Sequence, residues 1–168
     1  MIKEPTFNTV NNEIIDLDLS ITQKKKFRFG KDDSRIVEVN TSDMNLMQRV
    51  SVAYPKLQDL QTKASKLTEG IDTESNETEA NALNDITTIA ERLSAVDAEM
   101  RDLIDYMFNA PISAAAAPDG SMYDPFNGSF RYEHIIAVMI QQYEENLQSE
   151  FGKMEKQLKK HTDKYTRR

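Results

Sequence analysis

The sequence predicts an α+β fold that is mostly α: an N-terminal three-stranded antiparallel β-meander followed by a bundle of about four helices, two of them long. Three observations support it: an alternating apolar pattern near the N-terminus, a long apolar stripe with helical spacing in the middle, and a similar stripe near the end. We divide the chain into an arm and meander over residues 1–40 and a helical domain over 41–168, and expect one folding unit.

Three short runs predict the meander. Apolar and polar residues alternate over residues 15–21, which is the period of a half-buried strand. In the second run Phe27 and Phe29 alternate with cations, and residues 35–39 supply three β-branched side chains. Turn-forming residues at 30–33 separate these last two runs, so we expect them to pair as a hairpin and the first run to add a third strand.

Capping and breaking residues set the first helices. Residues 41–43 read Thr-Ser-Asp, which is typical of a helix N-terminus. Pro55 disfavours helical geometry at the preceding residue, so we expect a break or kink at Tyr54 and a further helix ending near Gly70. Residues 109–128 have no helical period, and we expect them to form a long ordered loop with docked apolar side chains.

The middle stripe, here called the central stripe, lies on a helix expected from about residue 79 to 108. Its members follow at alternating spacings of three and four residues: Leu83, Ile86, Ala90, Leu93, Asp97, Met100, Ile104 and Met107. Asp97 is its one polar member. The favoured interpretation is that Val96 replaces it in the core and Asp97 faces water. The alternative is a polar registry device, paired with a Lys, Arg or Tyr across the interface.

A second stripe, the C-terminal stripe, predicts a last helix from about residue 129 to 164. Its members have helical spacing: Tyr132, Ile136, Met139, Tyr143, Leu147, Phe151, Met154 and Leu158. At about 1.5 Å per residue this helix would be on the order of 50 Å long. We therefore expect its end to project beyond the compact body.

Charge and composition exclude several classes of function. The net charge is −7, with nine acids and one base over residues 69–100 and seven Lys or Arg over 153–168. An acidic chain is a poor candidate for binding nucleic acid. No apolar run is long enough for a membrane span, and the first residues lack a signal-peptide core, so we expect a cytoplasmic protein without membrane contact.

Catalytic and metal-binding patterns are absent from the sequence. There is no cysteine, and the two histidines, His134 and His161, would lie roughly 40 Å apart on one straight helix. The acids between residues 119 and 124 lack the spacing of a calcium loop. Neither a glycine-rich phosphate loop nor a nucleophile elbow occurs. We therefore predict a protein that is not an enzyme, with no catalytic residues, no cofactor and no metal.

Three segments resemble small tail-region proteins of siphophages and prophages of Gram-positive bacteria. They are KKFRFGKDDSRIVEVNTSDM at residues 25–44, GSMYDP at 120–125 and KKHTDKY at 159–165. The resemblance implies a tail assembly chaperone, a mostly helical protein that coats the long tape-measure protein while the tail tube polymerises around it. It further implies a homo-oligomer without enzymatic activity that acts in the host cytoplasm.

Our first hypothesis is a non-enzymatic phage protein that binds another phage protein, such as the tape-measure protein, through helix packing. The residues predicted to contact the partner lie on the two stripes and the basic end: Met100, Ile104, Met107, Met139, Tyr143, Phe151, Met154, Lys159, Lys160 and Lys164. The sequence leaves open that these residues form the intramolecular core. One alternative is a small acidic inhibitor of a host defence or replication enzyme, acting through residues 69–100. Another is a structural connector or completion protein of the virion.

Overall fold

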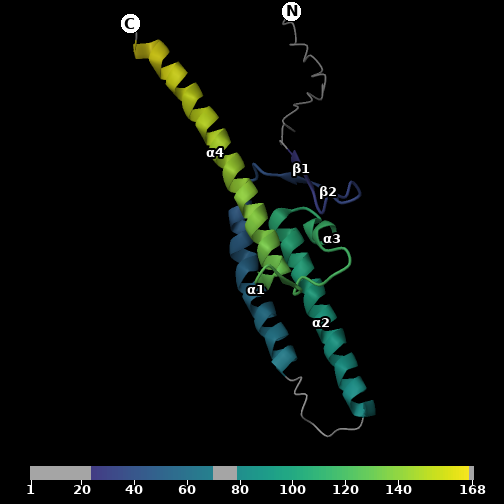
Figure 1. Ribbon diagram of the computed structural model, residues 1–168. Coiled ribbons are helices and arrows are strands. Elements are labelled where there is room, and N and C mark those ends of the chain that lie inside the picture. Colours follow the sequence, from purple (N-terminus) through teal and green to yellow (C-terminus); the bar gives the residue numbers. More distant parts are fainter. Residues whose placement is uncertain (1–23, 70–78, 167–168) are drawn as a thin grey trace, which may run out of the picture.

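The structure is a computed structural model that describes residues 24–69 and 79–166 (Figure 1). These residues are mostly helical, as the sequence predicts. The elements in chain order are β1 (Lys24–Arg28), β2 (Ile36–Asn40), α1 (Leu46–Glu69), α2 (Glu79–Phe108), α3 (Ile112–Ala116), β3 (Pro125–Phe126), β4 (Ser129–Phe130) and α4 (Arg131–Thr166).

The N-terminal sheet in the described part of the chain has two strands rather than the predicted three. β1 and β2 pair antiparallel, with Phe27 opposite Val37. Val37 and Val39 are buried in the core and Phe27 packs against it, so alternation places one face of the hairpin inward. This confirms the predicted hairpin. The third predicted strand, at residues 15–21, lies outside the described residues.

The predicted break at Tyr54 is wrong, because helix α1 continues through this position. It runs unbroken through Pro55, which lies on its exposed side. The buried side chains Ala53, Leu57 and Leu60 continue one stripe across the proline. Packing of this stripe against α2 therefore outweighs the local cost of the proline, which is about 3 kcal/mol in a helix interior.

The start of α1 also lies later than the Thr-Ser-Asp signal suggests. The carboxylate of Asp43 accepts a hydrogen bond from the Asn45 amide at 2.9 Å and one from the Arg49 guanidinium at 2.7 Å. Burial alone would raise the pKa of Asp43, but these hydrogen bonds outweigh it and hold the pKa below its usual value. Arg49 also donates to the Met107 carbonyl at 2.8 Å, which ties the start of α1 to the end of α2.

Residues 109–128 contain more regular structure than the single long loop that the sequence predicts. They include the short helix α3 and the two-residue strand β3, which pairs with β4 in a tight hairpin. Of the apolar residues in this segment, Met122 is fully buried, whereas Phe126 is about half exposed. The segment is therefore a packed structural unit, and it connects the end of α2 to the start of α4.

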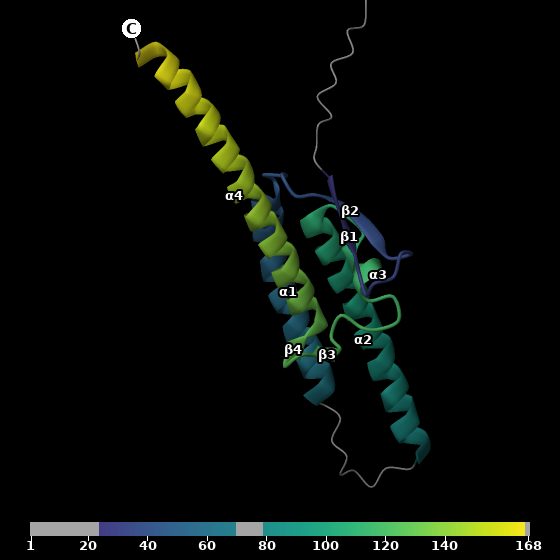
Figure 2. The same cartoon turned by 45° about the horizontal axis from the view of Figure 1, so that its top comes forward.

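The three long helices α1, α2 and α4 are staggered. α4 begins beside the middle of the α1–α2 pair. In both views it continues past the end of the pair where α1 starts and α2 ends (Figures 1 and 2). The shared core lies where all three helices overlap, and it includes Leu57 of α1, Ile104 of α2 and Met139 of α4. Outside this overlap each end of the molecule has fewer helices, which leaves parts of their apolar stripes uncovered.

We expect the substitution Pro55→Ala to raise the free energy of unfolding by about 1–3 kcal/mol, because alanine restores a helical N–H donor at an exposed position. Urea denaturation measures this change. Lys56→Ala, at the neighbouring exposed position, is the control and should change stability by less than about 0.5 kcal/mol. A destabilised Pro55→Ala variant would show that α1 depends on the proline.

Candidate partner-binding surface

Three charged residues on one face of α2 organise the segment that follows it. Asp97, Arg101 and Asp105 are spaced four residues apart and therefore share a helix face. The Arg101 guanidinium donates to the Asp97 carboxylate at 2.7 Å and to the carbonyls of Ala117 at 3.0 Å, Ser113 at 3.3 Å and Gly120. We call this set the Arg101 clasp. It gives a donor to the carbonyls of Ala117 and Gly120, which follow α3, and a second donor to the Ser113 carbonyl, which already accepts the Ala117 amide at 3.0 Å.

Asp97 has a role that the favoured sequence interpretation missed. Val96 is buried, as expected, but the Asp97 carboxylate does not simply face water. It accepts hydrogen bonds from the Ser121 hydroxyl at 2.8 Å and from the Met122 amide at 2.5 Å, in addition to its ion pair with Arg101. The structure therefore agrees better with the alternative interpretation, in which Asp97 pairs with a cation, although its partners lie within this chain. The sequence contained one signal for this pairing, because Asp97 and Arg101 are four residues apart, which is the spacing of an ion pair on a helix.

The same segment is held from two further sides. The Asp105 carboxylate accepts hydrogen bonds from the Ser113 amide at 2.7 Å and hydroxyl at 2.9 Å, at the start of α3. Arg35, next to β2, donates to the carbonyls of Ala115 at 2.6 Å and Ala116 at 2.9 Å. Two arginines from different elements thus cap the alanine-rich helix and attach the β-hairpin to it.

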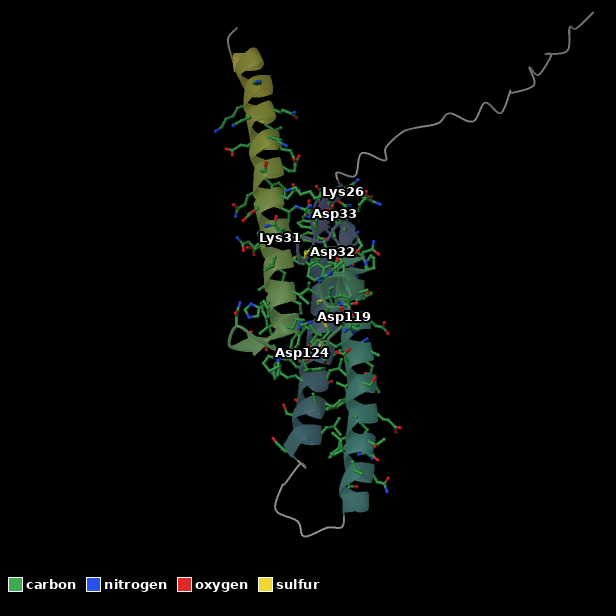
Figure 3. All side chains as sticks on the ribbon, turned by 45° about the vertical axis from the view of Figure 1, so that its right-hand side comes forward. Lys26, Lys31, Asp32, Asp33, Asp119 and Asp124 are labelled. Carbon is green, nitrogen blue, oxygen red and sulfur yellow. The ribbon has the colours of Figure 1, made fainter. Side chains whose placement is uncertain are left out.

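The clasp leads directly to the start of α4. Arg131 forms an ion pair with Asp124 at 3.2 Å, and its amide donates to the Asp124 carbonyl at 2.9 Å. The Tyr132 amide donates to the Met122 carbonyl at 3.0 Å. Figure 3 shows Asp119 and Asp124 on this segment, below Lys26 and Lys31 of the β1–β2 hairpin in that view. The position at which α4 begins is therefore fixed by polar contacts.

A cavity of about 600 Å³ lies beside this segment. It is bounded by α1 through Ala64, by α2 through Ala90 and Leu93, and by Tyr123 and Phe130. The Tyr123 hydroxyl is buried without a hydrogen-bond partner in the described part of the chain. Burial and the nearby carboxylates of Asp97 and Glu99 raise the pKa of Tyr123 to about 12, so the group stays neutral at physiological pH.

Chemistry-bearing clusters are scarce in the residues that the structure describes. Among them, no group of three or more His, Asp or Glu side chains is arranged to hold a metal ion. His134 packs edge-on against Phe126, with ring centroids 5.2 Å apart. The side chain of His161 lies outside the described residues.

Five of the residues predicted to bind a partner lie in the core. Met100, Ile104, Met107, Met139 and Tyr143 are each at most 1% exposed. Tyr143 contacts Phe108 across the bundle, with ring centroids 6.0 Å apart. In this structure these five side chains pack against the chain's own helices, which is the intramolecular arrangement that the sequence left open.

The remaining predicted residues lie on the projecting end of α4 (Figure 1). Phe151 is 50% exposed, Met154 51% and Leu158, one turn further on, 68%. We call these three residues the tip stripe. Lys159 and Lys160 are exposed on the same part of α4, and Lys159 pairs with Glu155 at 3.2 Å. Lys164 lies in the last turn of α4. The tip stripe is our candidate partner-binding surface.

Comparison with protein-family models, curated proteins and solved structures found no match to this chain. In the two described ranges, no helix combines the length and the apolar character that crossing a membrane requires.

We expect Arg101→Met to lower the free energy of unfolding by about 2–4 kcal/mol, since it removes the cation paired with the partly buried Asp97 carboxylate and the donor to the carbonyls of Ala117 and Gly120. Chemical denaturation followed by circular dichroism measures the loss. Arg92→Met, at an exposed position of the same helix, is the matched control and should be nearly neutral. Equal stability of the two variants would contradict the organising role of the clasp.

Alkaline titration tests the surroundings of Tyr123. Because its pKa is raised from 10.0 to about 12 in the folded chain, its contribution to stability is complete below pH 10 and is lost as pH rises towards 12. Phenolate absorbance should therefore show late-titrating tyrosines in the folded chain and not in the urea-denatured chain. Tyr123→Phe should remove one of them at little cost in stability, because the hydroxyl has no hydrogen-bond partner among the described residues.

Proposed function

We propose that this chain is a non-catalytic binding protein that packs the end of α4 against a helix of another protein. The observation that carries the proposal is the tip stripe: three large apolar side chains, about half exposed or more, aligned on a helix that extends past the rest of the bundle. Its spacing of three and four residues is that of a helix-packing face.

The chemistry of the tip stripe fits a helical partner. Phe151 offers a large rigid contact, and Met154 offers a flexible side chain that adapts to irregular surfaces. Burying such side chains contributes about 25 cal/mol for each Å² of apolar surface removed from water. The exposed Lys153, Lys156 and Lys160 lie on the other side of the helix, where they remain solvated and attract an acidic partner.

We propose further that the partner is the tape-measure protein of a phage tail and that the chain is a tail assembly chaperone acting in the host cytoplasm. This step is supported by the resemblance of three segments to tail-region proteins of siphophages. A tape-measure protein is long and helical, and it needs its apolar faces covered before the tail tube encloses it. A projecting helix with an adaptable apolar stripe is suited to that task.

The test is affinity capture of the tagged full chain, co-expressed with the tail genes of its phage and analysed by mass spectrometry. We expect wild-type chain to recover one very long helical tail protein. Met154→Glu should recover at least about 10-fold less, because a charge in an apolar contact is costly to bury. Ser149→Glu is the matched control, since it adds the same charge at an exposed position off the stripe.

Two outcomes would contradict the proposal. Equal recovery by Met154→Glu and Ser149→Glu would show that the tip stripe does not bind the partner. Recovery of a host enzyme without tail proteins would favour the inhibitor hypothesis, with the acidic residues 69–100 as the contact surface.

A further inference from the structure

The stagger of the helices leaves a second uncovered surface at the opposite end of the molecule from the tip stripe. Below the start of α4, α1 and α2 continue as a pair (Figures 1 and 2). We call the face between residues 61–69 of α1 and 79–94 of α2 the α1–α2 groove. Its upper end holds the cavity of about 600 Å³ that Ala64, Ala90 and Leu93 line beside Phe130.

Burial along the central stripe shows that no third helix of the described residues covers this groove. Met100 and Ile104, where α4 packs, are fully buried. Leu83 and Ile86 belong to the same stripe, yet they are 64% and 58% exposed. The stripe keeps its apolar character past the point where its cover ends. In the C-terminal stripe the order is reversed, since Met139 and Tyr143 are buried and the tip stripe is exposed.

The two uncovered surfaces match in length. Residues 79–94 and 150–166 each span about 25 Å as helix. The small side chains of Ala64 and Ala90 at the groove allow another helix to approach closely. A helix placed in the groove would occupy the position that α4 holds further along the bundle.

Their net charges are opposite. The two helix segments of the groove, residues 61–69 and 79–94, together carry four acids and three bases, whereas residues 150–166 of α4 carry five lysines and three acids. This arrangement favours contact between the α4 end and the groove, and it disfavours contact between two like ends.

We propose that a second copy of this chain occupies the groove, with the end of its α4 completing a three-helix bundle there. This inference rests on the proposed function, because it takes the tip stripe as a binding surface. It identifies what the tip stripe binds when no other partner is present. The contact is heterologous, so every copy keeps one free groove and one free α4 end, and assembly continues beyond two copies unless a ring closes. Because self-association and partner binding use the same stripe, they compete.

The first test is sedimentation velocity of the full chain over a range of concentrations. We expect the wild-type mass to increase with concentration. Met154→Glu removes the inserting stripe and Ala90→Glu blocks the groove, so each should weaken self-association at least about 100-fold. The matched control is Ala95→Glu, at an exposed position of α2 that does not line the cavity, and it should assemble like wild type.

Mixing the two defective variants separates docking from misfolding. Met154→Glu keeps an intact groove and Ala90→Glu keeps an intact α4 end, so together they should form a complex of one copy of each and no larger species. Failure of the mixture to associate would overturn the inference, as would a wild-type chain that stays monomeric at every concentration, or an Ala90→Glu variant that assembles like the control.

The outcome also distinguishes this inference from the proposed function. A monomeric wild-type chain that still captures the tail protein overturns self-docking and leaves the proposed function in place. A self-associating chain that captures no tail protein supports self-docking and contradicts the proposed partner. Where both hold, added tail protein should dissociate the assembly.

Discussion

The guanidinium of Arg101 is the contact on which the arrangement of this molecule depends. It joins the Asp97 carboxylate to three carbonyls of the segment between α2 and α4. The segment also buries apolar side chains in the core, among them Ile112 and Met122. The planar Arg101 side chain adds several fixed donors that Asp97 orients, and Arg35 and Asp105 hold the same segment from other sides.

The location of this clasp determines which surfaces stay uncovered. Because the clasp holds the segment against the middle of α2, α4 begins there and not at the end of the α1–α2 pair. A helix of 36 residues that begins halfway along its neighbours must extend past them. The same displacement that projects the tip stripe also opens the groove, so the proposed binding surface and its proposed receptor have one structural cause.

Much of the fold was predictable from periodicity. The two stripes predicted α2 and α4 nearly to the residue, and alternation predicted the hairpin of β1 and β2. Predictions failed where a local signal competed with packing. Pro55 signalled a break, but buried residues on both sides of it hold α1 together. The segment after α2 seemed irregular because α3 is only five residues long, and it is capped by arginines distant in sequence.

The candidate binding surface was likewise predictable only in part. The sequence by itself determined that the chain has two long amphipathic helices, an acidic middle and a basic end, because these properties reside in residue order. It did not determine which part of each stripe is buried, since Met100 and Leu83 have the same place in the periodic pattern. Only the tertiary structure decided that, because burial depends on where α4 begins, and that position is set by contacts from Arg101 to carbonyls up to 19 residues away.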